Sequence, residues 1–385
     1  MTSETSYRVL LVGAGFVNFG TPEGPWNHSK RLEKKLGPRL HVVGLVDPDR
    51  ARAEAALAGK ASSPHAASYA NATIYASINE AAAQLDPSLT PHAIIVGAPP
   101  AFRGTLDSSK GYDMEVQLVK GFPKSALFLE KPVTTGSVDA AIQVGKYLEK
   151  EKMLVGIGYM LRYGQAQQLM KKILAENNCE VMMTSARHIF TYDWALKPAW
   201  WHKSIDGGPI VENGTHICDL SRFFGGEVDL NSMMAHSIEW YEKPGKLSKL
   251  QIDESKIPED DRIPRFTSAT WKYESGAIGH LEYGVSLINA EWTCEITVWA
   301  DGFQLRLVDL FAGPTLYVKR PNSTKEEVHT FYDDDAYYNE MSAFIDTTET
   351  GDNKILSSYE DAARTYEMTL AIRTASENTR RPRSS

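Results

Sequence analysis

Hydrophobic residues in the first 160 positions form short continuous runs, separated by segments with the spacing of amphipathic helices. The runs cover residues 8–15, 40–48, 92–100, 126–132 and 154–160, and helical patterns such as 49–59 and 137–152 lie between them. Strands that are apolar at every position are buried on both faces, as they are in a parallel sheet covered by helices. The first part of the chain is therefore predicted to be an α/β domain.

The pattern changes after a helical stretch at residues 216–226. Residues 266–284 and 292–309 each read as two alternating strands around a turn, and strands in this order are typical of a mostly antiparallel sheet. Residues 242–265 are polar and contain prolines, which predicts a long surface excursion. Helical patterns at 335–351 and 359–376 close the chain, and we expect these helices to pack back on the first domain.

Composition narrows the class of protein. The chain has 385 residues, 41 Lys and Arg against 49 Asp and Glu, and a net charge of -8, so nucleic acid and anionic membranes are not expected partners. Its three cysteines are far apart, which argues against a disulfide framework or a zinc site. The start, MTSETSYR, lacks the pattern of a signal peptide, and no apolar run reaches about 18 residues. We therefore expect a cytoplasmic protein.

A glycine-containing segment after the first strand matches the dinucleotide-binding fingerprint. In Gly13-Ala14-Gly15-Phe16-Val17-Asn18, the first glycine permits a tight turn and the second lets backbone approach a pyrophosphate. The third fingerprint position, normally glycine, is Asn18, and residues 20–38 are longer than usual; both predict a local loop difference rather than lost binding. The alternative is a turn without a nucleotide.

The second strand ends in Asp47, whose carboxylate would accept hydrogen bonds from the adenine ribose hydroxyls. This favours NAD, because a carboxylate there would repel a 2′-phosphate. Arg50 and Arg52 follow closely and leave NADP open, unless they belong to a solvated helix face.

Further motifs follow in a fixed order: Ala98-Pro99-Pro100, Glu130-Lys131-Pro132, the segment 158–163 (GYMLRY) and the segment 207–219 (GGPIVENGTHICD). In this order and spacing the chain resembles the Gfo/Idh/MocA family, the relatives of glucose–fructose oxidoreductase and inositol dehydrogenase. The resemblance covers nearly the whole chain, including the strand pair around Glu274-Ser275-Gly276 and the closing helix.

The resemblance implies a Rossmann dinucleotide-binding domain over residues 1–155. It also implies a substrate-binding and oligomerisation α+β domain over 156–385, with an open, mostly antiparallel sheet that joins copies into a homo-oligomer. The nicotinamide would lie between the domains. The expected cofactor-binding residues are Gly13, Gly15, Phe16, Val17, Asp47, Ala98, Pro99, Glu130 and Lys131.

By the same resemblance, Lys131 would contact a substrate hydroxyl and the nicotinamide ribose, and His216 would be the general base. Glu212 stands where many members have aspartate, and on one helix it would share a face with His216, four residues on. The substrate-side candidates are Arg162, Tyr163, Asn213 and Trp201. For Arg162 and Tyr163 the alternative is bracing of the domain interface. For the aromatic stretch 192–202, stacking on a sugar ring competes with core packing.

The leading hypothesis is an NAD(P)-dependent oxidoreductase acting on a sugar, polyol or similar hydroxylated ring, without a metal, since the nicotinamide carries the chemistry. The first alternative is a non-catalytic regulator that senses the dinucleotide, as the yeast galactose repressor does, and the second is an NAD-dependent glycosidase. A pure regulator has no need to keep Lys131, Glu212 and His216 together, so their joint presence favours an enzyme.

Overall fold

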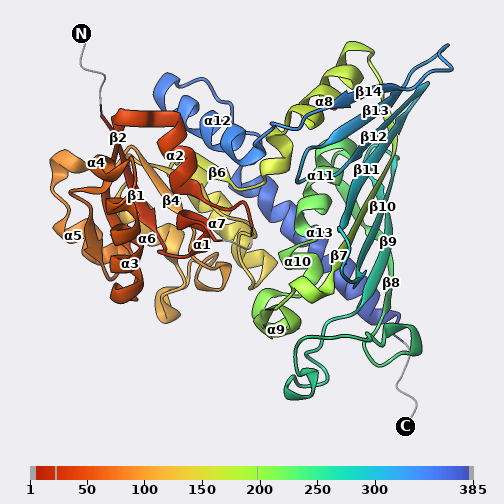
Figure 1. Cartoon of the computed structure of the whole chain (residues 1–385), viewed down its shortest axis with the longest axis horizontal. Coiled ribbons are helices and arrows are strands. Elements are labelled where there is room, and N and C mark those ends of the chain that lie inside the picture. The colour runs from red at the N-terminus through yellow and green to blue at the C-terminus, as the bar shows by residue number, and fades with distance from the viewer. Residues whose placement is uncertain (1–5, 22–23, 197, 381–385) are drawn as a thin grey trace. The chain divides into compact units, whose positions relative to one another are not determined.

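The computed structural model describes residues 6–21, 24–196 and 198–380, apart from the side chain of Asp206. Most of the segment MTSETSYR, on which the expectation about a signal peptide rests, lies outside the described residues. The chain divides into two compact units, one of residues 1–160 and 335–363 and the other of residues 161–334 and 364–385. Figure 1 labels their elements.

The first unit contains a six-stranded parallel sheet with the order β3-β2-β1-β4-β5-β6. Its strands are β1 (Tyr7–Val12), β2 (Leu40–Val46), β3 (Thr73–Tyr75), β4 (Ala93–Val96), β5 (Ala126–Leu129) and β6 (Val155–Ile157). Its helices are α1 (Phe16–Phe19), α2 (His28–Leu36), α3 (Arg50–Ala61), α4 (Ala66–Tyr69), α5 (Ile78–Gln84), α6 (Met114–Gly121), α7 (Val138–Lys150) and α12 (Ala336–Thr350). Each predicted apolar run contains a strand, whereas the short strand β3 was not predicted.

Burial explains why these runs form a parallel sheet. Val9, Leu10 and Leu11 in β1 are all fully buried, although neighbouring residues of a strand point to opposite faces. On one face the strands pack against Leu32 of α2 and Phe344 of α12 in a single hydrophobic cluster. Both faces of the sheet are therefore covered, as the continuous apolar pattern predicted.

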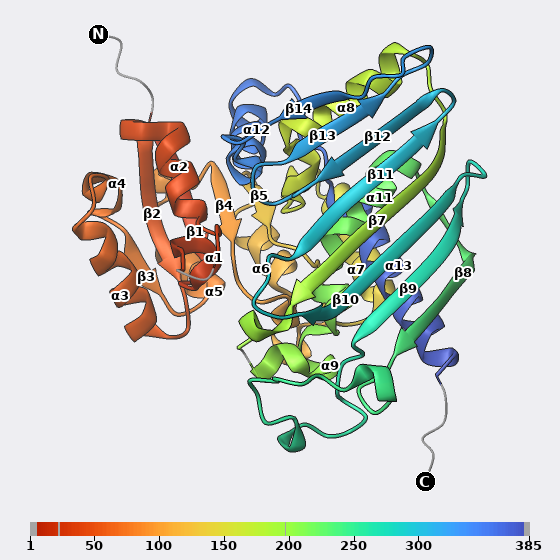
Figure 2. The same ribbon diagram turned by 45° about the vertical axis from the view of Figure 1, so that its right-hand side comes forward.

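The second unit contains an eight-stranded sheet with the order β14-β13-β12-β11-β7-β10-β9-β8, seen from one face in Figure 2. Its strands are β7 (Val181–Thr191), β8 (Val228–Ile238), β9 (Phe266–Tyr273), β10 (Ile278–Leu287), β11 (Thr293–Ala300), β12 (Phe303–Val308), β13 (Thr315–Lys319) and β14 (Glu327–Thr330). All neighbouring strands pair antiparallel except β7 and β10, which are parallel. The predicted fold class, a Rossmann domain followed by a domain with a mostly antiparallel sheet, is confirmed.

The helices of this unit are α8 (Gln165–Glu176), α9 (Lys203–Asp206), α10 (Pro209–Glu212) and α11 (Thr215–Gly225), joined by α13 (Tyr359–Asn378), which begins in the first unit. Helix α11 packs on β7, β10 and β11, and α8 packs on β12. Both helices lie on one face of the sheet, and no described helix of this unit covers the other face (Figures 1 and 2). Among the described residues, no helix combines the length and hydropathy that crossing a bilayer requires.

Residues 242–265 form a long excursion that is mostly exposed or half-buried, as predicted. Ile257 and Ile263 are nevertheless buried, the Asp261 carboxylate accepts the Ser204 N–H at 2.7 Å, and the Arg265 N–H donates to the Ile238 carbonyl of β8 at 2.7 Å. The excursion is therefore anchored to the body of its unit through its second half.

Candidate functional site

The fingerprint turn follows β1 and has the conformation that its first glycine was expected to allow. Gly13 has φ of +93°, and its N–H donates to the Val46 carbonyl at 2.8 Å. A Cβ at this position would lie 3.0 Å from the Ala98 backbone nitrogen, too close for a side chain beside a rigid backbone. Both the left-handed conformation and the close approach therefore require glycine at residue 13.

The second glycine has a different role. Gly15 has φ of −84°, which any residue adopts, and no atom lies within 4 Å of where its Cβ would be. The backbone is thus open on the side from which a phosphate group approaches such turns. Around it, Phe16 is exposed, Val17 and Ala98 are half-buried, and Pro99 is exposed. That these residues contact the pyrophosphate of a dinucleotide stays a prediction.

Asn18 explains how the chain manages without the third fingerprint glycine. Its fully buried amide donates to the carbonyls of Val12 at 3.0 Å and Gly13 at 2.7 Å. The side chain takes the space beside Gly97, where an added Cβ would lie 2.9 Å from the amide oxygen of Asn18. The amide therefore ties the first turn of α1 to the end of β1, so the departure at this position is accommodated by hydrogen bonds.

Asp47 lies directly after β2 and is buried beside the turn. One carboxylate oxygen accepts the Ala14 N–H at 2.7 Å and the other accepts the Asp49 N–H at 2.8 Å. An ionised carboxylate has about four acceptor positions, so capacity for ribose hydroxyls is left. Arg50 pairs with Glu54 of its own helix at 2.9 Å, which favours the solvated-helix interpretation for Arg50. Arg52 pairs with Asp49 at 3.1 Å and also lies 3.9 Å from a carboxylate oxygen of Asp47, so its charge stands beside the expected ribose site.

Glu130 and Lys131 follow β5, at the same edge of the sheet. Lys131 is half-buried. The Glu130 carboxylate accepts a hydrogen bond from His28 Nε2 at 2.7 Å, and its backbone carbonyl accepts one from Arg103. Burial alone would raise the pKa of the Glu130 carboxyl, but the hydrogen bond and charge of His28, with the charges of Lys131 and Arg103, hold that pKa below its ordinary value.

His28 was not singled out in the sequence. It lies in the 20–38 segment, which was interpreted as a loop with a helix, and its partner is 102 residues away. A lone histidine in a polar segment carries no local sign of such a contact.

In the second unit, Glu212 and His216 do not lie on one helix. Helix α10 ends at Glu212, and α11 begins at Thr215 after Asn213 and Gly214. The expectation that the two residues share the face of one continuous helix is therefore wrong. Gly208, with φ of +87°, and Pro209 start the short α10, and a Cβ on Gly214 would lie 3.0 Å from the Ile210 backbone. Gly214 thus permits the close approach of the start of α11 to α10.

Each candidate has its own contacts. A carboxylate oxygen of Glu212 accepts the indole N–H of Trp200 at 3.2 Å. His216 is 7% exposed, and its ring lies edge-on to Phe311 with centroids 5.8 Å apart. Asn213, between the two helices, accepts a hydrogen bond from the Tyr283 hydroxyl at 3.3 Å.

Arg162 is buried and forms a two-pronged ion pair with Asp219, with distances of 2.8 and 2.6 Å. Thr365 donates to the same carboxylate at 3.0 Å. Tyr163, the neighbour of Arg162, is also buried. This geometry gives Arg162 a structural contact within the second unit, which favours a structural role over the predicted substrate contact; bracing of the domain interface stays a prediction.

Trp201 is fully buried, and its indole N–H donates to the Ala195 carbonyl at 2.8 Å. Its placement supports core packing rather than the predicted substrate contact. The half-buried neighbour Trp200 is the tryptophan that touches a candidate site residue, Glu212.

The aromatic stretch 192–202 packs against aromatic rings from distant segments of the chain, which was not predicted from the sequence. Phe190 lies 5.6 Å from Trp200 and 5.5 Å from Trp292, centroid to centroid, and Trp194 lies 5.9 Å from Trp292. Trp292 in turn lies 5.8 Å from Phe311, the residue beside His216. We call Phe190, Trp194, Trp200, Trp292 and Phe311 the aromatic cluster. It contacts both Glu212 and His216, and Trp194 at its end is 53% exposed.

His188 lies beneath these rings and contacts Phe190, Trp292, Phe311 and Tyr283. Burial lowers the pKa of His188 to about 4, so its imidazole is neutral near pH 7 and belongs to the core of the cluster.

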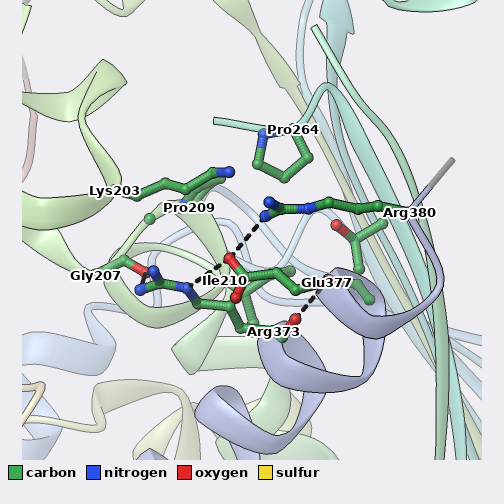
Figure 3. A pocket seen from close by; sticks show the side chains of 11 residues that line it. Lys203, Gly207, Pro209, Ile210, Pro264, Arg373, Glu377 and Arg380 are labelled. Carbon is green, nitrogen blue, oxygen red and sulfur yellow. Dashed lines mark hydrogen bonds and ion pairs between the residues drawn. The ribbon is translucent and has the colours of Figure 1, made fainter. Parts of the chain in front are cut away.

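A cavity with an empty volume of about 310 Å³, its open mouth included, lies beside Gly207, Gly208 and Pro209 (Figure 3). Three of its charged lining residues form ion pairs with one another: Glu377 binds both Arg373 at 3.2 Å and Arg380 at 2.7 Å. Arg380 also pairs at 2.9 Å with Glu239, which lies outside the lining. The cavity contains none of the predicted site residues, and we assign it no ligand. Among the described residues, no group of three or more His, Cys, Asp or Glu is arranged to hold a metal ion.

The parallel sheet, the glycine turn and the buried aspartate after β2 define a dinucleotide-binding Rossmann protein. A family model described as "Oxidoreductase family, NAD-binding Rossmann fold" matches residues 7–159, and one described as "Putative oxidoreductase C terminal domain" matches residues 162–303. An uncharacterized protein of Schizosaccharomyces pombe is 41% identical over 370 residues, which are 95% of this chain and 96% of that protein.

Solved structures share the fold at low identity. An NAD-binding oxidoreductase from Klebsiella pneumoniae has a TM-score of 0.71 at 16% identity, over 97% of this chain and 98% of that one. The WlbA dehydrogenase from Bordetella pertussis, solved with NADH and UDP-GlcNAcA, has a TM-score of 0.69 at 14% identity, over 97% of each chain. The chain belongs to the Gfo/Idh/MocA oxidoreductase family, and its cofactor is a nicotinamide dinucleotide.

The two glycines should respond differently to the same substitution. Gly13→Ala should lower the free energy of unfolding by roughly 1–3 kcal/mol, because alanine is strained at this φ. Gly15→Ala should leave it unchanged or raise it by up to about 1 kcal/mol, while weakening NAD binding about tenfold or more, because its methyl group fills the space left for the pyrophosphate. Chemical denaturation and NAD titration measure both, with each variant as the other's control. Equal effects on stability would contradict this assignment.

Asp47 should set the choice between NAD and NADP. We expect the wild type to bind NAD more tightly and Asp47→Asn to narrow the gap, because the amide removes the negative charge that repels a 2′-phosphate. Asparagine can keep one hydrogen bond from a backbone N–H, so it disturbs the turn less than alanine would. Titration of both cofactors measures the ratio, with the exposed neighbour Asp49→Asn as control. A wild type that prefers NADP would show that Arg50 or Arg52 dominates.

Proposed function

We propose that this oxidoreductase transfers a hydride between a nicotinamide cofactor and the CH–OH group of a sugar, polyol or similar hydroxylated ring, with NAD as the favoured cofactor. The observation that carries the proposal is the joint presence of Lys131 after β5 and of Glu212 and His216 around the start of α11. Lys131 belongs to the first unit and the other two residues to the second. The proposal assigns all three to one reaction.

In the oxidative direction, the nicotinamide supplies the carbon that accepts the hydride, which is chemistry that no side chain can provide. His216 takes the proton of the reacting hydroxyl and later releases it to water, and Lys131 holds and polarises the same oxygen. Proton transfer by a positioned group of this kind contributes about 10²–10⁴-fold to a rate. Glu212 orients His216 or a neighbouring substrate hydroxyl. In reduction, the same groups work in reverse.

The aromatic cluster supports a ring as substrate. Apolar faces of sugar and polyol rings pack well on indoles, and Trp194 offers an exposed indole at the end of a cluster that touches both Glu212 and His216. The WlbA protein of the same fold was solved with a nucleotide sugar, which agrees with a sugar-like substrate. A regulator that only senses the dinucleotide would need neither the cluster nor the three polar residues.

The proposal also covers where the enzyme acts and what it binds. We propose that it acts in the cytoplasm on a small molecule, without nucleic acid or membrane partners, and that copies associate through the sheet of the second unit. The face without helices carries ion pairs of Arg187 with Glu282 and Glu295, at 2.5 and 2.9 Å. A surface that mixes such charges with threonines and serines is suited to contact with a second polar sheet.

The reaction itself is tested by following the absorbance of reduced nicotinamide while the protein and NAD meet a panel of sugars and cyclic polyols. Lys131→Ala and His216→Ala should each lower kcat by about two orders of magnitude or more. NAD affinity should change little for His216→Ala, whereas some loss is expected for Lys131→Ala. The exposed Lys124→Ala and His236→Ala are the matched controls. Near-normal turnover of His216→Ala would remove the histidine from the mechanism.

A further inference from the structure

The candidate lysine is preceded by Glu130, whose side chain is 13% exposed and is held in place by another segment of the chain. His28 is 2% exposed, and its Nε2 lies 2.7 Å from Glu130 Oε1. The other oxygen of Glu130 accepts the backbone N–H of Lys131 at 3.3 Å. His28 thus supplies a side-chain hydrogen bond to this carboxylate. Because a carboxylate can only accept, the imidazole Nε2 is the donor.

The surroundings leave this carboxylate little freedom. Gly158 lies against it, and a Cβ there would come within 3.0 Å of the carboxyl atoms. Arg103 donates to the backbone carbonyls of Glu130 and Pro132 on either side of Lys131. His28 is itself wedged edge-on against Phe128 of β5, with ring centroids 5.1 Å apart. The side chain of Glu130 and the backbone of Lys131 therefore form one packed arrangement with His28.

The charges around this pair come from several elements. Lys131 and Arg103 face Glu130 from the β5 edge and from the segment after β4. Arg31 of α2 also lies near this pair and binds Asp335, the residue before α12. Tyr337 and Glu340 approach it from α12 itself. His28 acts on this carboxylate both through its charge and through a direct hydrogen bond. Loss of His28 would remove both effects, which favours the protonated form of Glu130.

We propose that His28 is a positioning residue of this enzyme, which keeps Glu130 ionised and oriented so that Lys131 is presented to substrate with a negative charge beside it. The inference rests on the proposed function of Lys131 and adds a residue to it. His28 comes from the 20–38 segment, in which the chain departs from the usual fingerprint length. The added segment thus contributes directly to the candidate site.

The direction of the pH effect follows from the hydrogen bond. His28 favours the ionised form of Glu130 and so lowers the pKa of that carboxyl. Removing His28 raises this pKa, and Glu130 then becomes protonated at a higher pH. If turnover needs ionised Glu130, the acidic limb of the pH–rate profile then moves to higher pH. At a pH below the limb, each pH unit of this shift lowers turnover about tenfold.

The test compares His28→Leu, which removes the donor, with His28→Gln, whose amide N–H can replace it. We expect His28→Leu to move the acidic limb up by about one unit or more and His28→Gln to keep it close to that of the wild type. His92→Leu is the matched control, since His92 is a partly buried histidine of the same unit whose ring accepts the Arg8 N–H. It should affect stability without moving the limb. An acidic limb that stays in place in His28→Leu would overturn the proposal.

A second readout separates this inference from the proposed function. In the NAD-bound protein, the Glu130 carboxyl is titrated by isotope-edited infrared spectroscopy, with Glu130→Gln to assign its band. If no hydroxylated compound is turned over, the proposed function fails, while a higher titration point in His28→Leu than in His28→Gln still supports the link from His28 to Glu130. Identical titration of Glu130 in the wild type and both variants would overturn the inference, whatever the activity.

Discussion

Parallel pairing of four neighbouring strands is the constraint on which the candidate cofactor site depends. Val12 at the end of β1 pairs with Val46 of β2 and with Val96 of β4, and Val96 pairs with Leu129 of β5. These four residues form one row across the sheet, so the chain leaves all four strands at the same edge. Gly13, Asp47, Ala98 and Glu130 come within two residues of that row. Segments far apart in sequence are gathered by the register alone, as in other open α/β sheets.

The sequence predicted those features that depend on neighbouring residues in the chain. Continuous apolar runs predicted five strands of the first sheet, and the Gly-x-Gly turn after β1 identified the phosphate side of the site. The third strand, β3, was missed because Thr73–Tyr75 is only three residues long and lacks a run of its own. The unusual residue Asn18 could be flagged from the sequence, but its hydrogen bonds to Val12 and Gly13 could not be foreseen.

Contacts between residues far apart in the chain could not be predicted from the sequence. The pairs His28–Glu130 and Arg162–Asp219 join positions 102 and 57 residues apart. The spacing of Glu212 and His216 suggested one helix, whereas α10 ends at Glu212 and α11 begins at Thr215. Arg162 was a candidate for substrate binding because its charge was visible in the sequence and its partner was not. A buried charge almost always has a partner, but only the fold shows which one.

The comparison of the two units suggests how one family fold accepts different substrates. In the first unit, the glycine turn is expected to recognise the pyrophosphate common to all nicotinamide dinucleotides, whereas Asp47 is expected to distinguish NAD from NADP. The second unit places aromatic side chains beside Glu212 and His216, and these come from the end of β7, the segment after it, the β10–β11 connection and the β12–β13 connection. The Glu212 carboxylate accepts the Trp200 indole N–H, which ties the candidate site to the aromatic cluster. The substrate is therefore expected to be selected mainly by the second unit.

Direct hydride transfer is the central claim, and deuterium labelling tests it most directly. The protein is incubated with NAD and a hydroxylated ring compound deuterated at the carbinol carbon, and the reduced nicotinamide is analysed by mass spectrometry and NMR. We expect one deuterium on C4 of the nicotinamide per compound oxidised, and none when the label is on another carbon. Tight binding of NAD without any transfer across the panel of compounds would contradict the account and favour a regulator that senses the dinucleotide.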